Sequence, residues 1–273
     1  MGPFSALGAG VRAASLILIV ASTIAAASKP DLLTAARRFY NQGQYDQALE
    51  AATEAANSPP TMPSARLIMG RARLERFRQA AVARELDDAR ADFRAVDPRA
   101  LDPRERIELQ VGLGELLYLE DRFGPAAELL DPVVDSSATL APDAHERVLD
   151  WWATALDRQA QSLPGAERAL VYPRITERME QELRRDPASA PAMYWLAASA
   201  RASGDLERAW AAASAGWIRA ALGRDRGVAL RADLDRLVTE AIIPDRAARA
   251  PARERRQAAA SMTAEWEAFK KTW

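Results

Sequence analysis

The sequence contains no cysteine and a single histidine, His145. The lack of cysteine excludes disulfides, thiolate metal sites and cysteine nucleophiles, so the fold must be held by packing alone. His145-Glu146 resembles the start of the helical zinc-protease motif, but Leu149 stands where that motif has its second histidine. We therefore expect neither a metal nor another cofactor, and we interpret His145 as a solvated residue in the first turn of a helix.

Other motifs of catalytic chemistry are also missing. Gly112-x-Gly114 lacks a third glycine at the dinucleotide-binding spacing and lies in a helical pattern, so the expected role of both glycines is close packing between helices. The sequence has no P-loop and no nucleophile-elbow serine. Carboxylates are abundant among arginines in helical segments, a pattern that predicts solvated helix faces, and we predict that the protein is not an enzyme. These carboxylates include Glu85, Asp87, Asp88, Glu180 and Glu182.

Lysine is nearly absent. Among the 37 basic residues only Lys29, Lys270 and Lys271 are lysines, and the joint abundance of arginine and alanine is typical of a GC-rich genome. The net charge of −1 and the pI of about 6.1 do not indicate nucleic acid as a partner. With 49% hydrophobic and 27% charged residues, the composition is that of a folded chain and not a disordered one.

No stretch of useful length alternates as a β-strand does, whereas apolar residues recur at helical spacing through most of the chain. Prolines divide this pattern, because proline lacks the amide that a helix interior needs and restrains the residue before it. We therefore predict an all-α fold forming one continuous superhelix. A helix over about 226–241, ended by Pro244, precedes a charged stretch over 246–273. The predicted helix pairs are 31–57, 63–97, 104–135, 143–186 and 190–221.

Small residues recur at fixed spacing within these pairs. In three of them a small residue is followed twelve residues later by alanine, and seven residues further on by another compact residue. Closely packed helices need small residues at fixed places, and a period in the mid-thirties is typical of a helical solenoid. The positions are Ala36, Ala48 and Ala55, then Gly114, Ala126 and Val133, then Ala197, Ala209 and Gly216, with Gly70 lying 34 residues after Ala36.

These stretches resemble the tetratricopeptide repeat, whose pattern is large-x2-Leu-Gly-x2-Tyr, then Ala-x3-Phe, then Pro. A fourth copy begins at Gly70, and we predict that its turn is long, because Ala89-x3-Phe93 falls about seven residues late. A fifth, degenerate copy surrounds Trp151-Trp152. The resemblance implies a right-handed superhelix (α-solenoid) over 28–221 with capping helices over 222–273. The three best copies are Leu32-x2-Ala35-Ala36-x2-Phe39 through Pro60, Gln110-x2-Leu113-Gly114-x2-Leu117 through Val133, and Met193-x2-Leu196-Ala197-x2-Ala200 through Gly216.

In tetratricopeptide superhelices the first helix of each pair lines the concave face, where peptide ligands usually bind. The resemblance therefore implies a protein or peptide partner on a face rich in aromatic rings and arginines, which interfaces favour. The alternative for Tyr40, Tyr118 and Tyr194 is that they fill gaps between helices. Leu33 and Arg37 stand where the family's chaperone-tail clamp has Lys and Asn, so that ligand is not supported. The expected concave residues are Leu33, Arg37, Tyr40, Asn41, Leu67, Arg71, Glu75, Val111, Glu115, Tyr118, Tyr194 and Arg201.

An aromatic stripe marks the C-terminal segment. Met262, Trp266, Phe269 and Trp273 lie on one face of a predicted helix. Because the end of a solenoid needs cover, we predict a cap folded over the last repeat. The alternative is a docking helix for a partner's groove, with Trp266, Phe269 and Trp273 as a secondary surface. The arginines over 246–256 are expected to be solvated, or to contact anionic lipid if the chain is membrane-anchored.

The first 27 residues have the features of a secretory signal peptide. Arg12 precedes an apolar run over 13–24, which ends in Ala25-Ala26-Ala27. We predict export to the periplasm or cell envelope with cleavage after Ala27. The alternative is an uncleaved membrane anchor, since residues 2–27 carry one charge. No cysteine follows the run, which excludes a lipoprotein, and Arg37-Arg38 lies too late for a twin-arginine signal.

Two classes of function stay open. The favoured one is a non-catalytic exported scaffold or adaptor that binds a protein or peptide of the cell envelope through its concave face. It becomes a membrane-anchored envelope-assembly factor if the N-terminal segment is retained. The other class is a helical glycan hydrolase using two carboxylates, although such enzymes carry a separate catalytic domain and no segment here is free to form one.

Overall fold

The computed structural model describes residues 31–141, 143–223 and 225–273, and within these ranges it contains helices and no strand. This confirms the predicted all-α class. The helices are α1 (Leu32–Asn41), α2 (Tyr45–Ala55), α3 (Met62–Ala80), α4 (Ala83–Arg94), α5 (Pro103–Leu119), α6 (Phe123–Leu130), α7 (Ala144–Gln161), α8 (Gly165–Arg185), α9 (Ala190–Ala202), α10 (Leu206–Arg219), α11 (Val228–Leu237), α12 (Ile243–Ala248) and α13 (Arg255–Thr272).

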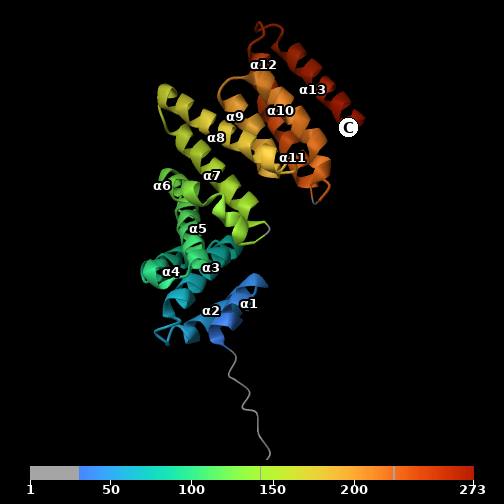
Figure 1. Cartoon of the computed structure of the whole chain (residues 1–273). Coiled ribbons are helices and arrows are strands. Elements are labelled where there is room, and N and C mark those ends of the chain that lie inside the picture. The colour runs from blue at the N-terminus through green and yellow to red at the C-terminus, as the bar shows by residue number, and fades with distance from the viewer. Residues whose placement is uncertain (1–30, 142, 224) are drawn as a thin grey trace, which may run out of the picture.

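The helices pack as successive pairs, from α1 with α2 to α9 with α10. Each first helix also contacts the first helix of the next pair, so α1, α3, α5, α7, α9 and α11 form one row. We call this row the inner helices. Each second helix packs against the first helix of the following pair, and the result is the elongated, repeat-like stack of Figure 1. The five predicted helix pairs are all present.

Small residues allow the close contacts inside these pairs. A Cβ atom added at Gly70 would lie 2.5 Å from the Phe93 ring, and one added at Gly114 would lie 2.5 Å from the Leu130 side chain. A Cβ at Gly112 would lie 2.8 Å from Phe93. These distances leave no room for a side chain, so the packing role predicted for Gly112 and Gly114 is confirmed.

The second pair differs from the prediction. Its turn is not long: α3 has 19 residues, and only Ala81 and Val82 separate it from α4. Ala81 takes the left-handed conformation, φ 53°, that commonly ends a helix. The extra residues therefore lengthen the first helix, and Ala89 and Phe93 still reach the buried interface.

Pro244 does not end the helical segment after residue 241, and the prediction is wrong there. The chain continues from α11 through a π-helical turn, Val238–Ile242, into α12. Pro244 lies in the first turn of α12, where a missing amide hydrogen is tolerated best.

The C-terminal helix α13 folds back onto the stack and caps it (Figure 1). Trp266 is fully buried, with its ring centroid 5.8 Å from that of Trp210 and 5.5 Å from that of Trp217. Its Nε1 donates a hydrogen bond of 2.7 Å to Asp235. The docking alternative is therefore wrong for Trp266. Phe269 packs against the same cluster, and Trp273 remains 60% exposed.

Of the arginines over 246–256, Arg249, Arg253, Arg255 and Arg256 are exposed as expected, whereas Arg246 is not simply solvated. Arg246 pairs with Glu207 at 2.8 Å and lies 4.9 Å from the centroid of the Trp210 ring.

The predicted signal peptide, residues 1–27, lies outside the described residues. No helix in the described part of the chain is long and apolar enough to span a membrane.

Candidate partner-binding site

Two cavities follow one another along the inner helices. The first, about 270 Å³, lies among α1, α3, α5 and α7, and the second, about 540 Å³, lies among α7, α9 and α11. Asp143 and Arg147 line both, so the two cavities adjoin, and we refer to them together as the recess. We call the first the mixed-charge cavity, lined by Tyr40, Tyr45, Arg71, Glu75, Arg104, Glu108, Glu115 and Trp151 among others. We call the second the acidic cavity, lined by Asp143, Glu146, Arg147, Asp150, Pro191, Tyr194, Leu230 and Asp233 among others.

Ion pairs between α3 and α5 form one wall of the mixed-charge cavity. Arg71 and Arg78 are seven residues apart on α3, and Glu108 and Glu115 are seven apart on α5, so each pair of side chains lies on one helix face. Arg71 Nη1 is 2.7 Å from Glu108 Oε2, and Arg78 Nη1 is 3.5 Å from Glu115 Oε1. These contacts fix the register of the two inner helices.

Aromatic rings complete the wall. The guanidinium carbon of Arg71 lies 4.4 Å from the centroid of the Tyr40 ring, and that of Arg78 lies 4.7 Å from the centroid of the Trp151 ring. Tyr45 lies beside Tyr40, with ring centroids 5.7 Å apart. Arginines in these cation–π positions are held in place before any ligand arrives.

Burial raises the pKa of two groups in this cavity. It raises the pKa of the Tyr40 hydroxyl to about 12, against the opposing charge of Arg71. Burial also raises the pKa of Glu115 to about 7; Arg78 opposes this shift, and the nearby charge of Glu75 adds to it. Glu115 therefore changes its charge close to neutral pH.

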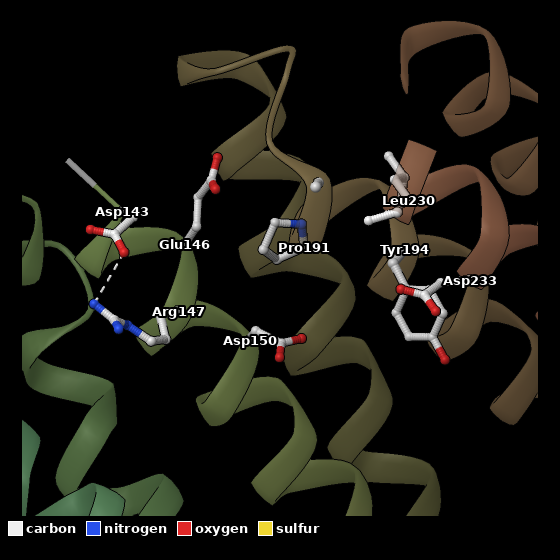
Figure 2. Close-up of a pocket in the computed structure, with 10 residues that line it drawn as sticks. Asp143, Glu146, Arg147, Asp150, Pro191, Tyr194, Leu230 and Asp233 are labelled. Atoms are coloured by element: carbon white, nitrogen blue, oxygen red, sulfur yellow. Dashed lines mark ion pairs between the residues drawn. The ribbon is translucent and has the colours of Figure 1, made fainter. Parts of the chain in front are cut away.

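The acidic cavity brings together carboxylates from three segments (Figure 2). Asp143, Glu146 and Asp150 come from the start and the body of α7, and Asp233 comes from α11. The only guanidinium among its described lining residues is that of Arg147, which pairs with Asp143 at 3.2 Å. Carboxylates thus outnumber cations around this cavity.

Asp150 is a partly buried carboxylate in the lining of the acidic cavity. Burial raises its pKa, although a 2.8 Å hydrogen bond from Trp195 Nε1 opposes the shift, and the charge of Asp233 adds to it. Pro191, Tyr194 and Leu230 supply the apolar part of the lining. The cavity therefore combines negative charge with an apolar surface.

Half of the twelve predicted concave residues line the mixed-charge cavity. Tyr194 lines the acidic cavity and, with Arg201, a further recess next to α12. The prediction is wrong for Leu67, which is fully buried in the core between α3 and its neighbours. The six residues in the mixed-charge cavity are Tyr40, Asn41, Arg71, Glu75, Val111 and Glu115.

The remaining three predicted residues make contacts within the protein. Leu33 packs partly against the first core cluster and lines a separate recess at the N-terminal end. Arg37 on α1 pairs with Glu105 on α5. Tyr118 stacks on Trp151 with ring centroids 6.4 Å apart, so it fills a gap between helices, as the alternative for this residue predicts.

Sequence reasoning missed the contribution of α7 and one carboxylate of α5, Glu108. Glu108, Arg147, Trp151 and Asp150 all line the recess, yet the repeat register predicts none of them. The matched seven-residue spacing of arginines on α3 and glutamates on α5 was the signal that could have found Glu108. For α7, the degenerate repeat pattern left no register from which inward residues could be assigned.

Three expectations about surface charges were also wrong, those for His145, for Glu85 and for Glu182, which is only 3% exposed. His145 is not solvated: its side chain is 13% exposed, its Nδ1 lies 2.8 Å from the Val134 carbonyl oxygen, and its Nε2 lies 2.9 Å from Glu182. Glu85, expected on a solvated face, is largely buried between Arg73 and Arg76. Ion pairs between different helices therefore bury charged side chains that the sequence pattern assigned to the surface.

Within the described residues, no group of three or more His, Asp or Glu side chains is arranged to hold a metal ion. Comparisons with protein-family models, with curated proteins and with solved structures found no match for this chain.

Proposed function

We propose that this protein is a tetratricopeptide-like solenoid without catalytic function, which binds an extended segment of a protein partner along its inner helices. The observation that carries the proposal is the recess formed by the two adjoining cavities, because their lining residues come from α1, α3, α5, α7, α9 and α11 in order. A bound segment running along this recess would contact every repeat. Rings and arginines fixed by internal contacts lower the entropic cost of such binding.

The partner belongs, in this proposal, to the cell envelope. The support is the signal-like sequence of residues 1–27, which ends in Ala25-Ala26-Ala27. N-terminal sequencing of the protein recovered from its host envelope tests this point. A start at Ser28 supports export with cleavage, whereas an intact Met1 favours the membrane-anchored form.

Partner binding is tested by two matched substitutions. The purified chain is used to capture its partner from envelope extract, and the affinity of the purified partner is then measured for Tyr194→Ala and Leu170→Ala. Tyr194 lines the recess, whereas Leu170 lies on the second helix α8 and is 76% exposed. We expect at least about tenfold weaker binding, roughly 1.4 kcal/mol, for Tyr194→Ala and no change for Leu170→Ala. Equal effects of the two substitutions would contradict an inner binding face.

A glycan hydrolase is the second candidate, and one observation favours it. Asp150, whose pKa is raised by burial, shares a cavity with the exposed carboxylate of Asp233 (Figure 2). Two carboxyl groups that share a cavity, one of them with a raised pKa, are the groups that acid-assisted glycoside cleavage uses. Release of reducing ends from cell-wall glycan by the wild type, and its loss in Asp150→Asn, would replace the binding proposal with this one.

A further inference from the structure

One end of the mixed-charge cavity has more arginines than carboxylates. Arg71 Nη1 is 2.7 Å from Glu108 Oε2, and Arg104 Nε is 3.3 Å from Glu108 Oε1. Two guanidinium groups therefore share a single carboxylate, one on each of its oxygens. Arg104 is 58% exposed at the rim, where an incoming anion can reach it.

The other end has the opposite imbalance. Arg78 Nη1 lies 3.5 Å from Glu115 Oε1 and 3.8 Å from Glu75 Oε2, so two carboxylates share one arginine. Arg147, which also lines the cavity, is paired with Asp143, and its charge acts on Glu115 as well, as does that of Arg71. The cavity as a whole is close to neutral but dipolar.

Glu115 is the group at the negative end that lacks a full set of partners. Its side chain is 9% exposed and lines the cavity, and no donor among the described residues hydrogen-bonds to its Oε1, for which Arg78 is an ion-pair contact only. A buried carboxylate oxygen without a hydrogen bond is costly unless a proton or a ligand donor satisfies it. The pKa of about 7 fits this geometry, because a proton replaces the missing donor.

We propose that the mixed-charge cavity binds a zwitterion whose ammonium group lies at Glu115 and Glu75 and whose carboxylate lies at Arg71 and Arg104. The ligand of this chemistry is a lysine with a free α-carboxylate, either at the C-terminus of a peptide or as the free amino acid. The inference rests on the proposed function, since it defines the end of the bound segment.

The dimensions of the cavity agree with this ligand. Glu108 and Glu115 are seven residues apart on α5, which separates their Cα atoms by about 10 Å. The carboxylate carbon and the ammonium nitrogen of an extended lysine are about 7.5 Å apart by standard bond lengths, which is shorter than this Cα separation. A volume of about 270 Å³ suits one side chain, and the rings of Tyr40, Tyr45 and Trp151 can cover its methylene groups.

The test uses calorimetric titration of the purified protein with 6-aminohexanoate, a probe that carries only the two charges and the methylene chain. Hexanoate and hexylamine, which carry one charge each, are its controls. The protein variants are Glu115→Gln and Arg104→Gln, one at each end, with Asp233→Asn in the acidic cavity as the matched control. Melting curves show that each variant is folded.

We expect 6-aminohexanoate to bind at least about tenfold more tightly than either control compound. Each of the two cavity variants should lose at least about tenfold in affinity, whereas Asp233→Asn should stay within about twofold. Affinity for the wild type should rise from pH 6 to pH 8 as Glu115 loses its proton, and Glu115→Gln should remove that dependence. No binding, or equal binding of hexylamine and 6-aminohexanoate, would overturn the inference.

Two further ligands distinguish the sources of the zwitterion. If the source is a peptide, an N-acetylated peptide ending in lysine should bind when its C-terminus is free and should not bind as its C-terminal amide. If the source is the amino acid, free lysine should bind more tightly than that peptide. Either result supports the shared chemistry. If 6-aminohexanoate does not bind while Tyr194→Ala still weakens the captured partner, this inference fails and the proposed function stands.

Discussion

Arginine and aromatic side chains gather at both ends of the helix stack, but they line an open cavity at one end and a closed core at the other. In the mixed-charge cavity, Arg71 and Arg78 lie over Tyr40 and Trp151 at the edge of a recess. At the C-terminal end, Trp210, Trp217 and Phe269 enclose Trp266, and α13 covers them.

This difference arises because only one of the two groups is covered by a further helix. The C-terminal cluster is sealed because α13 supplies the central ring of Trp266 and the ammonium group of Lys270, and Asp235 of α11 accepts hydrogen bonds from Trp266 Nε1 and from Lys270 Nζ, each at 2.7 Å. The mixed-charge cavity has no such cover among the described residues, and its Glu115 keeps an oxygen without a hydrogen bond. Residue types alone therefore do not separate a binding surface from a core; the cover that a further helix supplies does.

The largest effect is expected at the sealed end. Trp266→Ala should lower the free energy of unfolding by about 3–5 kcal/mol, because it empties a fully buried site. The matched substitution Trp273→Ala should change it by about 0.5 kcal/mol or less, since that ring is 60% exposed. Urea unfolding measures both. Similar losses for the two tryptophans would mean that α13 does not seal the end as described.

In the mixed-charge cavity, by contrast, we expect a substitution to raise the free energy of unfolding. The pKa of Glu115 is raised to about 7 from 4.5, so the stability that this group contributes is present below about pH 4.5 and is lost as the pH rises through 7. Glu115→Gln stays neutral and should therefore stabilise the protein at pH 8 by about 2–3 kcal/mol while changing little at pH 4. Urea unfolding at the two pH values checks this. A variant that is less stable at pH 8 would show that the charged carboxylate is well satisfied and that the cavity is not incomplete.

Close packing in the repeats between the two ends is tested at a glycine. Gly114→Leu should cost about 1–3 kcal/mol or more, because its new side chain must displace Leu130. Gly165→Leu is the control: nothing lies within 4 Å of a Cβ at Gly165, and we expect a change within about 0.5 kcal/mol. Equal melting temperatures for the Gly114 variant and the wild type would mean that α5 and α6 are not packed in this register.

The smallest effect is expected at His145, on the outer side of the recess. The hydrogen bond to Glu182 raises the pKa of His145 above its usual 6.5, against its burial and helped by the Val134 carbonyl. Its stabilising contribution is therefore present below pH 6.5 and is lost as the pH rises through the folded-state value.

Glu182→Gln should lower the free energy of unfolding by about 1 kcal/mol or less at pH 6, a figure discounted for solvent screening, and by less at pH 9. Because the wild type and the variant both contain Glu115, the difference between their free energies of unfolding cancels the pH dependence that Glu115 contributes. A deficit that is the same at both pH values would show that His145 does not carry the charge of this pair.

The sequence predicted the helix pairs because local rules determine them. Small residues such as Gly114 and Ala126 must lie where helices touch, and prolines mark the breaks, so five pairs could be assigned from spacing alone. The length of α3 could not, because the left-handed turn at Ala81 that ends it carries no glycine. The candidate site was found in part, through the repeat register on α1, α3 and α5.

The rest of the site depends on contacts between residues far apart in the chain. Arg37 and Glu105 are 68 residues apart, and Trp266 is satisfied by Asp235, 31 residues away. Spacing within a helix shows which face a residue occupies, but not whether a distant helix covers that face. The sequence therefore placed Trp266 and Leu67 among possible surface residues, although packing buries both.

The central claim is that the inner helices form the partner surface. Site-specific photocrosslinking in envelope extract tests it most directly, with the reactive residue placed at Glu75 or Tyr194 in the recess and at Leu170 on α8 as the control. We predict that both recess positions crosslink to the same protein and that Leu170 does not. Crosslinking of that protein from Leu170 with none from Glu75 or Tyr194 would contradict the claim.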